Sequence, residues 1–189
     1  MPHGPGLGPH GPGLGPHAVV GLGNPGAEYA GTRHNVGQRV LDLLVRRLRA
    51  RFHRDKRAHV AHAAWNGEAV ALIKLQSFMN VSGPAVAAAL DQVGASAEDL
   101  ILVHDDIDLP LGTVRVRMKG SHGGHRGVRS VIETLGTSDI KRVKIGIGRP
   151  TTRGDVADHV LSRFEVDELP AVDQAVAEAA ERVLALIRS

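Results

Sequence analysis

The chain has 189 residues, of which 42% are hydrophobic, 23% charged and 3% aromatic, so it fits one folded domain rather than a wholly disordered protein. It contains no cysteine, which excludes disulfides, thiolate nucleophiles and cysteine-bound metal centres. The net charge is +3, but residues 165–189 hold six acids against two arginines, which leaves +7 on residues 18–164 and indicates a polyanionic partner. Because no run of 18 apolar residues and no secretory leader is visible, we expect a cytoplasmic protein without a membrane span.

The N-terminus repeats the heptapeptide HGPGLGP at residues 3–9 and 10–16. Glycine, proline and histidine in this pattern cannot bury a core, so we predict that residues 1–17 form a disordered extension. Metal binding by its three histidines, at positions 3, 10 and 17, is an alternative. The folded domain is therefore expected to cover residues 18–189.

From residue 18 onward, predicted strands and helices alternate. Short apolar runs predict strands, apolar residues at helical spacing predict helices, and Asn66-Gly67 between two strands predicts a hairpin. The predicted strands cover 18–22, 58–65, 69–75, 100–103, 114–119 and 142–147, and the predicted helices cover 35–50, 82–93, 124–135 and 171–187. This order predicts a single α/β domain with a mixed, mostly parallel twisted sheet flanked by helices.

The first predicted strand ends in GLGNPG at residues 21–26, which matches the G-x-G-x-x-G pattern of dinucleotide-binding folds. That pattern requires a helix to begin in the loop, but Pro25 and Gly31 interrupt a segment without helical periodicity. A nucleotide-dependent oxidoreductase therefore stays only an alternative. Asn24 lies at the carboxyl end of the strand, where open α/β sheets bind their ligands.

Three further polar segments lie beside predicted elements. His34 precedes the first helix, where a histidine is either a capping or surface residue or a catalytic group. Residues 104–108, HDDID, follow a central strand, and their carboxylates could bind Mg²⁺, form a turn or orient an imidazole. Asn80 precedes the second helix and is expected in its N-cap region.

The glycine-rich segment GSHGGHRG, at residues 120–127, opens the third predicted helix. Free N–H groups at a helix start suit an anion, although these glycines could simply form a turn. His122 and His125 could ligate a metal ion, but no carboxylate stands near them at helical spacing, so we expect no metal site.

Cations are clustered in three segments, which together predict a basic surface on one half of the domain. Five of them follow one another without an intervening acid, five more come shortly after, and residues 46–57 add seven against a single acid. Such a surface favours phosphate contacts, and the scarcity of aromatic residues disfavours stacking on unpaired bases. We therefore expect recognition of a folded RNA by its backbone and shape. The first two groups are Arg115, Arg117, Lys119, Arg126 and Arg129, then Lys141, Arg142, Lys144, Arg149 and Arg153.

Taken together and in order, five blocks of sequence resemble bacterial peptidyl-tRNA hydrolase, a family match that covers essentially all of residues 18–189. Five separate blocks in register are far more specific than any single motif. The blocks are VVGLGNPGAEYAGTRHNVG (19–37), SFMNVSGPAV (77–86), LVHDDIDLPLG (102–112), GSHGGHRGVRSVIETLGT (120–137) and KRVKIGIGRP (141–150).

This resemblance implies hydrolysis of the ester that joins a peptide to the 3′-terminal ribose of tRNA. His34 would be the general base that activates water, and Asp105 would orient it. Asn24 and Asn80 would position the peptide carbonyl, the main chain and the water. Such a mechanism needs no cysteine, and the resemblance implies no metal and no other cofactor.

The resemblance also implies how tRNA is bound. Tyr29 and Met79 would line the cleft near the 3′-terminal nucleotide, and Arg117 and Lys144 would grip the 5′-phosphate. Peptidyl-tRNA is then the expected partner, and the protein is expected to be a monomer.

One position departs from the family pattern, because Arg126 follows His125 where the family usually has Asn. An arginine there could replace the usual tRNA contact with a phosphate contact, since its guanidinium binds phosphate bidentately. It could also mark a catalytically silent RNA-binding module on the same fold. His34, Asp105, Asn24 and Asn80 are all present, which favours an active enzyme.

Overall fold

The computed structural model describes residues 15–54, 58–151 and 155–188. The predicted repeat extension falls almost entirely on residues 1–14, outside the described residues. Its last residue, His17, already belongs to the first strand, which begins one position earlier than expected. Within the described residues, no helix is both long enough and apolar enough to cross a membrane.

The described strands form one sheet in the order β2-β3-β4-β1-β5-β7-β6. Strands β4, β1, β5 and β7 pair in parallel, whereas β2 with β3, β3 with β4, and β6 with β7 pair antiparallel. Only β3 and β6 thus run against the other strands, which confirms the expected mixed, mostly parallel sheet. The strands are β1 (His17–Gly21), β2 (His53–Arg54), β3 (Ala58–Trp65), β4 (Glu68–Leu75), β5 (Leu100–Asp106), β6 (Val114–Arg117) and β7 (Lys141–Gly146).

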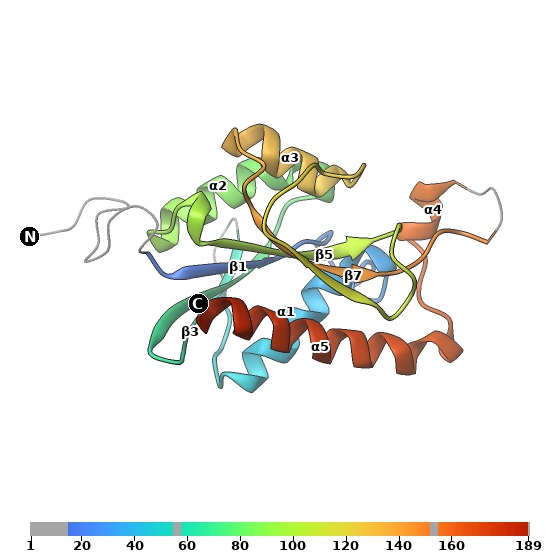
Figure 1. Cartoon of the computed structure of the whole chain (residues 1–189), viewed down its shortest axis with the longest axis horizontal. Helices are drawn as coiled ribbons and strands as arrows, with labels where there is room; N and C mark the ends of the chain where they lie inside the picture. Colours follow the sequence, from blue (N-terminus) through green and yellow to red (C-terminus); the bar gives the residue numbers. More distant parts are fainter. Residues whose placement is uncertain (1–14, 55–57, 152–154, 189) are drawn as a thin grey trace, which may run out of the picture.

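Helices cover both faces of the sheet. Figure 1 shows α2 and α3 together on one face and α1 and α5 on the other, with α4 beside the carboxyl ends of the strands. The helices are α1 (Val36–Arg47), α2 (Ser82–Val93), α3 (Arg126–Leu135), α4 (Val156–Val160) and α5 (Leu169–Arg188). Short 3-10 turns are η1 (Arg33–Asn35), η2 (Met79–Val81), η3 (Ala97–Asp99) and η4 (Val166–Glu168).

Two apolar cores lie between these layers, because the side chains of a strand alternate between its faces. Val19 and Ile101 belong to the core under α1 and α5, whereas Val20 and Leu102 belong to the core under α2 and α3. The central strand β5 is buried on both faces, which explains its unbroken apolar run.

Most predicted elements are confirmed, with differences at their ends. Asn66 and Gly67 both adopt positive φ, as the predicted Asn-Gly hairpin turn requires. The predicted helix 35–50 is shorter and begins after the separate turn η1, and the helix predicted from residue 124 begins at Arg126 because Gly123 and Gly124 also adopt positive φ. Strand β2 and helix α4 were not predicted.

The start of α1 lies unusually close to the sheet, and glycine makes this possible. A Cβ on Gly37 would lie 2.3 Å from the carbonyl oxygen of Val103, and one on Gly21 would lie 2.7 Å from the carbonyl oxygen of Gly37. Real side chains do not tolerate such distances, so this packing needs both glycines. It brings η1, and with it His34, against the carboxyl ends of β1 and β5.

Candidate active site

A cleft of about 880 Å³ opens at the carboxyl ends of the parallel strands. This is the place where open α/β sheets bind ligands. All nine predicted site residues line it: Asn24, Tyr29, His34, Met79, Asn80, Asp105, Arg117, Arg126 and Lys144. They come from the segments that follow β1, β4 and β6 and from the strands β5, β6 and β7, so the fold brings together residues that are up to 120 positions apart.

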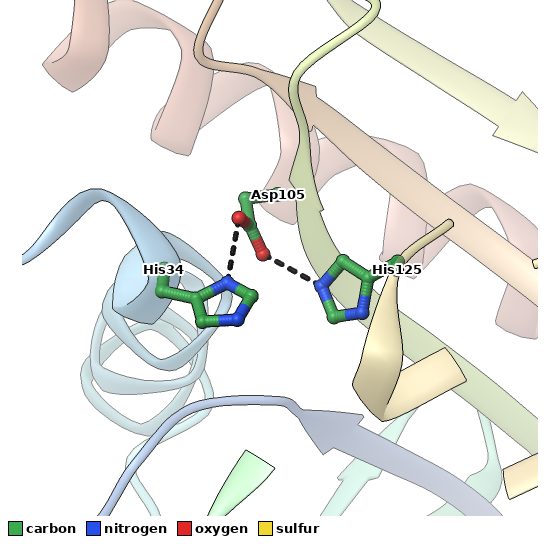
Figure 2. Close-up of side chains that lie close together, drawn as sticks. All are labelled: His34, Asp105 and His125. Atoms are coloured by element: carbon green, nitrogen blue, oxygen red, sulfur yellow. Dashed lines mark hydrogen bonds and ion pairs between the residues drawn. The ribbon is translucent and has the colours of Figure 1, made fainter. Parts of the chain in front are cut away.

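At the centre of the cleft, one carboxylate lies between two imidazoles (Figure 2). Oδ2 of Asp105 lies 2.7 Å from Nδ1 of His34, and Oδ1 lies 2.8 Å from Nε2 of His125. Asp105 is the last residue but one of strand β5, His34 comes from η1 and His125 is the N-cap of α3. The pairing of His34 with Asp105 is the one that the resemblance implies, whereas the bond to His125 was not anticipated.

The surrounding hydrogen bonds identify the proton positions. Nδ1 of His125 accepts the backbone N–H groups of Gly127 and Val128, so the proton of neutral His125 is on Nε2 and is donated to Asp105. Burial raises the pKa of Asp105, but the charges and hydrogen bonds of His125 and His34 outweigh it and hold that pKa well below its usual range. Asp105 is therefore ionised and accepts from Nδ1–H of His34, which leaves Nε2 of His34 able to take a proton.

The same hydrogen bonds determine whether His34, Asp105 and His125 could bind a metal ion. Ligand atoms of His34, Asp105 and His125 lie within 4.8 Å of one another, and His122 is not part of this group. A metal ion would need the Nε2 lone pair of His125, but that nitrogen carries the proton because Nδ1 is occupied as an acceptor. His122 instead accepts the N–H of Gly124 within the glycine turn. The donor set is thus arranged for proton transfer, and it does not suit a cation.

Asn24 is held so that its amide nitrogen is available. Its Oδ1 accepts the N–H of Met79, 2.8 Å away, which fixes the amide and leaves Nδ2 as a donor. Asn35 holds the backbone of Asn24 from the other side, because its Oδ1 accepts the Asn24 N–H and its Nδ2 donates to the Asn24 carbonyl, both at 2.9 Å. Asn35, which was not among the predicted site residues, therefore joins the loop of Asn24 to the turn of His34.

Asn80 and two aromatic rings form the outer wall of the cleft. Asn80 lies in η2 and is exposed, and it does not cap α2, contrary to the N-cap expectation. Tyr29 packs edge-on against Phe78, with 6.2 Å between the ring centroids. Phe78 is 55% exposed and lines the same cleft, so it adds an apolar surface that the sequence interpretation did not include.

Beneath this centre lies His104, which is fully buried. Burial and the nearby His125 lower the pKa of His104 to about 3, although a hydrogen bond to the Asp105 carbonyl opposes them. His104 is therefore neutral, and its ring meets that of His125 edge-on with centroids 4.8 Å apart. This edge-on contact helps to hold the ring of His125 in position.

The cations that line the cleft differ in whether an acidic side chain lies beside them. Arg117 and Arg126 are exposed and have no acidic partner among the described residues, whereas Nζ of Lys144 lies 3.6 Å from Asp106. Arg142, counted among the surface cations from the sequence, is buried instead and donates to the carbonyls of the glycine segment and of Ser138. Its role is to hold that segment in place.

Two other expectations about loops are also revised. The N–H groups at the start of α3 are occupied by His125, so they do not form the anion site considered from the sequence. Asp106 accepts the N–H of Asp108 and Asp108 pairs with Arg149, so these acids form a turn and do not converge with Asp105 on a cation.

The GLGNPG segment has a packing role. A Cβ on Gly23 would lie 2.8 Å from the amide of Gln38 and 2.9 Å from that of Asn35, so this glycine makes room for the start of the first helix. Residues 24–32 form turns and no helix begins there. The context that a dinucleotide-binding loop requires is therefore absent from this part of the chain.

Comparison with known proteins identifies the family of the chain. Residues 18–189 match the model of the family described as peptidyl-tRNA hydrolase. The chain is 44% identical over 171 residues to the peptidyl-tRNA hydrolase of Oceanobacillus iheyensis, covering 90% of this chain and 91% of that one. It is 49% identical over 162 residues to that of Aquifex aeolicus, covering 85% and 84%.

Solved structures give the same result. A peptidyl-tRNA hydrolase in complex with N-propanol has a TM-score of 0.86 at 31% identity, covering 92% of this chain and 89% of that one. The enzyme from Acinetobacter baumannii has a TM-score of 0.84 at 28% identity, covering 99% and 91%. A purine nucleoside phosphorylase from Toxoplasma gondii, at 0.55 and 10% identity, covering 93% of each chain, shares the fold alone. The chain belongs to the peptidyl-tRNA hydrolase family.

Proposed function

We propose that this chain hydrolyses the ester between peptide and tRNA in peptidyl-tRNA by general-base catalysis, with His34 as the base. The hydrolase activity follows from membership of the family, and the roles of individual residues are our proposal. The observation that carries them is the hydrogen-bonded series His34–Asp105–His125 inside the cleft. It combines a free imidazole nitrogen with an ionised carboxylate that fixes the tautomer.

In the first step a water molecule attacks the ester carbonyl carbon. Nε2 of His34 takes the proton of that water while the new C–O bond forms, and the carbonyl oxygen becomes an oxyanion. Ionised Asp105 stabilises the resulting imidazolium, because it accepts from Nδ1–H at 2.7 Å. His125 holds the other carboxylate oxygen, which keeps Asp105 in the orientation that His34 needs.

In the second step the tetrahedral intermediate collapses. The bond to the ribose oxygen breaks, and His34 returns its proton to that oxygen, so the free base and the tRNA hydroxyl are restored. Nδ2 of Asn24, which is left available as a donor, and the exposed amide of Asn80 would stabilise the oxyanion. No nucleophilic side chain and no metal is required for these steps.

The tRNA would be held by the basic side of the same cleft. Arg117 and Arg126 are exposed and unpaired among the described residues, so they can contact phosphate without first breaking an ion pair. Lys144 would contribute less, because Asp106 already lies beside it. Tyr29 and Phe78 offer ring surfaces for the terminal nucleotide at the outer end.

The experiment that tests this function measures peptide release from an N-acylated aminoacyl-tRNA in the presence of a chelator, with tRNA binding measured in parallel. We expect turnover that the chelator does not reduce. Binding without turnover would leave the silent RNA-binding module, the alternative that Arg126 raises. Activity that disappears with chelator and returns with added metal would refute the metal-independent mechanism.

A cytoplasmic location and a monomeric state are also part of the proposal. Peptidyl-tRNA is a product of translation, so an enzyme that acts on it must share its compartment. Sedimentation of the whole chain with and without tRNA should give the mass of one chain, and of one chain with one tRNA.

A further inference from the structure

We infer that Arg33 and Glu168 form a partly buried ion pair that positions the catalytic turn η1, and that the rate of hydrolysis depends on its geometry. The inference rests on the proposed role of His34, the residue next to Arg33. Neither Arg33 nor Glu168 lines the cleft, so both would act through His34 without touching the substrate.

The two charged groups meet as a fork. Nη1 of Arg33 lies 3.0 Å from Oε2 of Glu168, and Nη2 lies 2.9 Å from Oε1. Nε of the same guanidinium donates to Oγ of Ser162 at 2.9 Å, and the group stacks over the ring of Phe164 at 5.1 Å. This arrangement uses the planar geometry of arginine, which lysine cannot reproduce.

The pair is also partly shielded from water, chiefly on the side of Arg33. The side chain of Arg33 is 7% exposed and that of Glu168 is 23% exposed. Glu168 is fixed independently, because its Oε1 accepts the N–H of Glu165 at the start of η4. Its hydrogen bond to Arg33 lowers the pKa of Glu168, partly opposed by burial, so the carboxylate stays charged at neutral pH. A rigid carboxylate thus faces a rigid guanidinium.

The backbone extends the same connection. The N–H of Arg33 donates to the carbonyl of Ser162 at 2.9 Å, and Thr32 forms an isolated antiparallel bridge with Arg163. The segment 162–168 follows α4, whose residues line the cleft, and leads into α5. The pair therefore fixes one side of η1 to the C-terminal part of the chain, while Asp105 fixes the other side through His34.

A loss of this pair should cost rate and leave substrate binding intact, because the cations that hold tRNA lie on β6, β7 and α3. In Arg33→Lys the charge is kept but the fork is lost, and in Glu168→Gln the fork shape is kept but the charge is lost. We expect kcat to fall about tenfold in each, with KM within about twofold of the unchanged chain, since small misplacements of a catalytic group are costly.

A spectroscopic measurement reports on the turn directly. The proton between Nδ1 of His34 and Asp105 should give a downfield proton NMR resonance, assigned by its absence in His34→Ala. In Arg33→Lys and Glu168→Gln we expect this resonance to shift or broaden. The matched control is Arg39→Lys, because Arg39 pairs with Asp173 between α1 and α5 at 3.3 Å and lies outside the cleft. It should leave kcat and the resonance unchanged.

Thermal unfolding is recorded for every variant, and rates are measured well below each midpoint, so that loss of folded protein is not counted as loss of rate. Arg33→Lys and Glu168→Gln that are folded, with unchanged kcat and an unchanged resonance, would overturn the inference. If instead His34→Ala retains full activity, the proposed function itself fails, whatever the two pair variants show. An equal effect in Arg39→Lys would mean general destabilisation and would likewise overturn the positioning role.

Discussion

At the catalytic end of the cleft, His34, Asp105 and His125 are nearly buried and each is held by short hydrogen bonds. At the basic end, Arg117 and Arg126 are exposed and have no acidic partner among the described residues. The difference reflects the different requirements of proton transfer and of polyanion binding. A proton transfer needs groups fixed before the reaction, whereas a polyanion is attracted by charge at many positions and tolerates mobile side chains. Changes at the first end should therefore act on rate, and changes at the second on binding.

Among the changes that leave the proposed base His34 in place, the largest effect is expected from Asp105→Asn. The amide cannot accept from His34 and His125 as a carboxylate does, and it cannot stabilise an imidazolium. We predict that single-turnover hydrolysis falls by about a hundredfold or more, while the Kd for tRNA stays within about twofold. Equal losses in rate and binding would mean that the two ends of the cleft are not separable.

The next effect concerns the basic end. In Arg117→Ala, KM for the tRNA substrate should rise several-fold with kcat nearly unchanged, and the slope of log K against log salt should fall by about one. Lys144→Ala should do less, because Asp106 already neutralises part of its charge. Arg182→Ala is the control: Arg182 lies on α5 beside Glu178, outside the cleft. A salt slope unchanged in Arg117→Ala would contradict the proposed contact between Arg117 and phosphate.

Arg126→Asn restores the residue that is usual in the family. It tests further whether the catalytic end and the basic end of the cleft act separately. Arg126 is exposed at the first position of α3, directly after the cap His125, whose side chain accepts from Gly127 and Val128. We predict a smaller salt slope and a modest rise in Kd, with kcat within about twofold. A gain in kcat of tenfold or more would show that Arg126 impairs the catalytic end, and would favour the RNA-binding module.

The smallest expected effect is on stability. The pKa of His104 is lowered to about 3 by burial, so between that value and the unfolded value near 6.5 the unfolded chain binds one more proton. The free energy of unfolding should therefore decrease as pH falls from about 6.5, by about 1 kcal/mol per pH unit from this residue. In His104→Gln the decrease between pH 6 and pH 4.5, measured by urea unfolding, should be shallower. Parallel curves would contradict the buried neutral state.

Local sequence patterns predicted some elements of the fold and missed others. Short apolar runs and the Asn66-Gly67 turn predicted the β3–β4 hairpin almost to the residue, because both signals are local. Strand β2 has two residues and helix α4 has five, too few for any periodicity to register. Their positions are set by packing against neighbouring elements.

The site shows the same division. The resemblance identified His34, Asp105 and Asn24, but the cap made by His125 depends on how the glycine turn folds, which no spacing reveals. Arg142 lies in β7, and its buried guanidinium donates to the carbonyls of Ser121 and Gly120, which are 21 and 22 positions away. The fork of Arg33 joins residues 135 positions apart. Groups satisfied by long-range partners are the ones that local sequence patterns miss.

The most direct test of the account is to measure single-turnover hydrolysis and tRNA affinity on the same preparation of His34→Ala. If His34 is the base and the basic end binds independently, hydrolysis should fall by about a thousandfold or more, in line with the loss of a general base, while the Kd stays within about twofold of the unchanged chain. Hydrolysis that persists within about tenfold would contradict the account, because a group other than His34 would then activate the water.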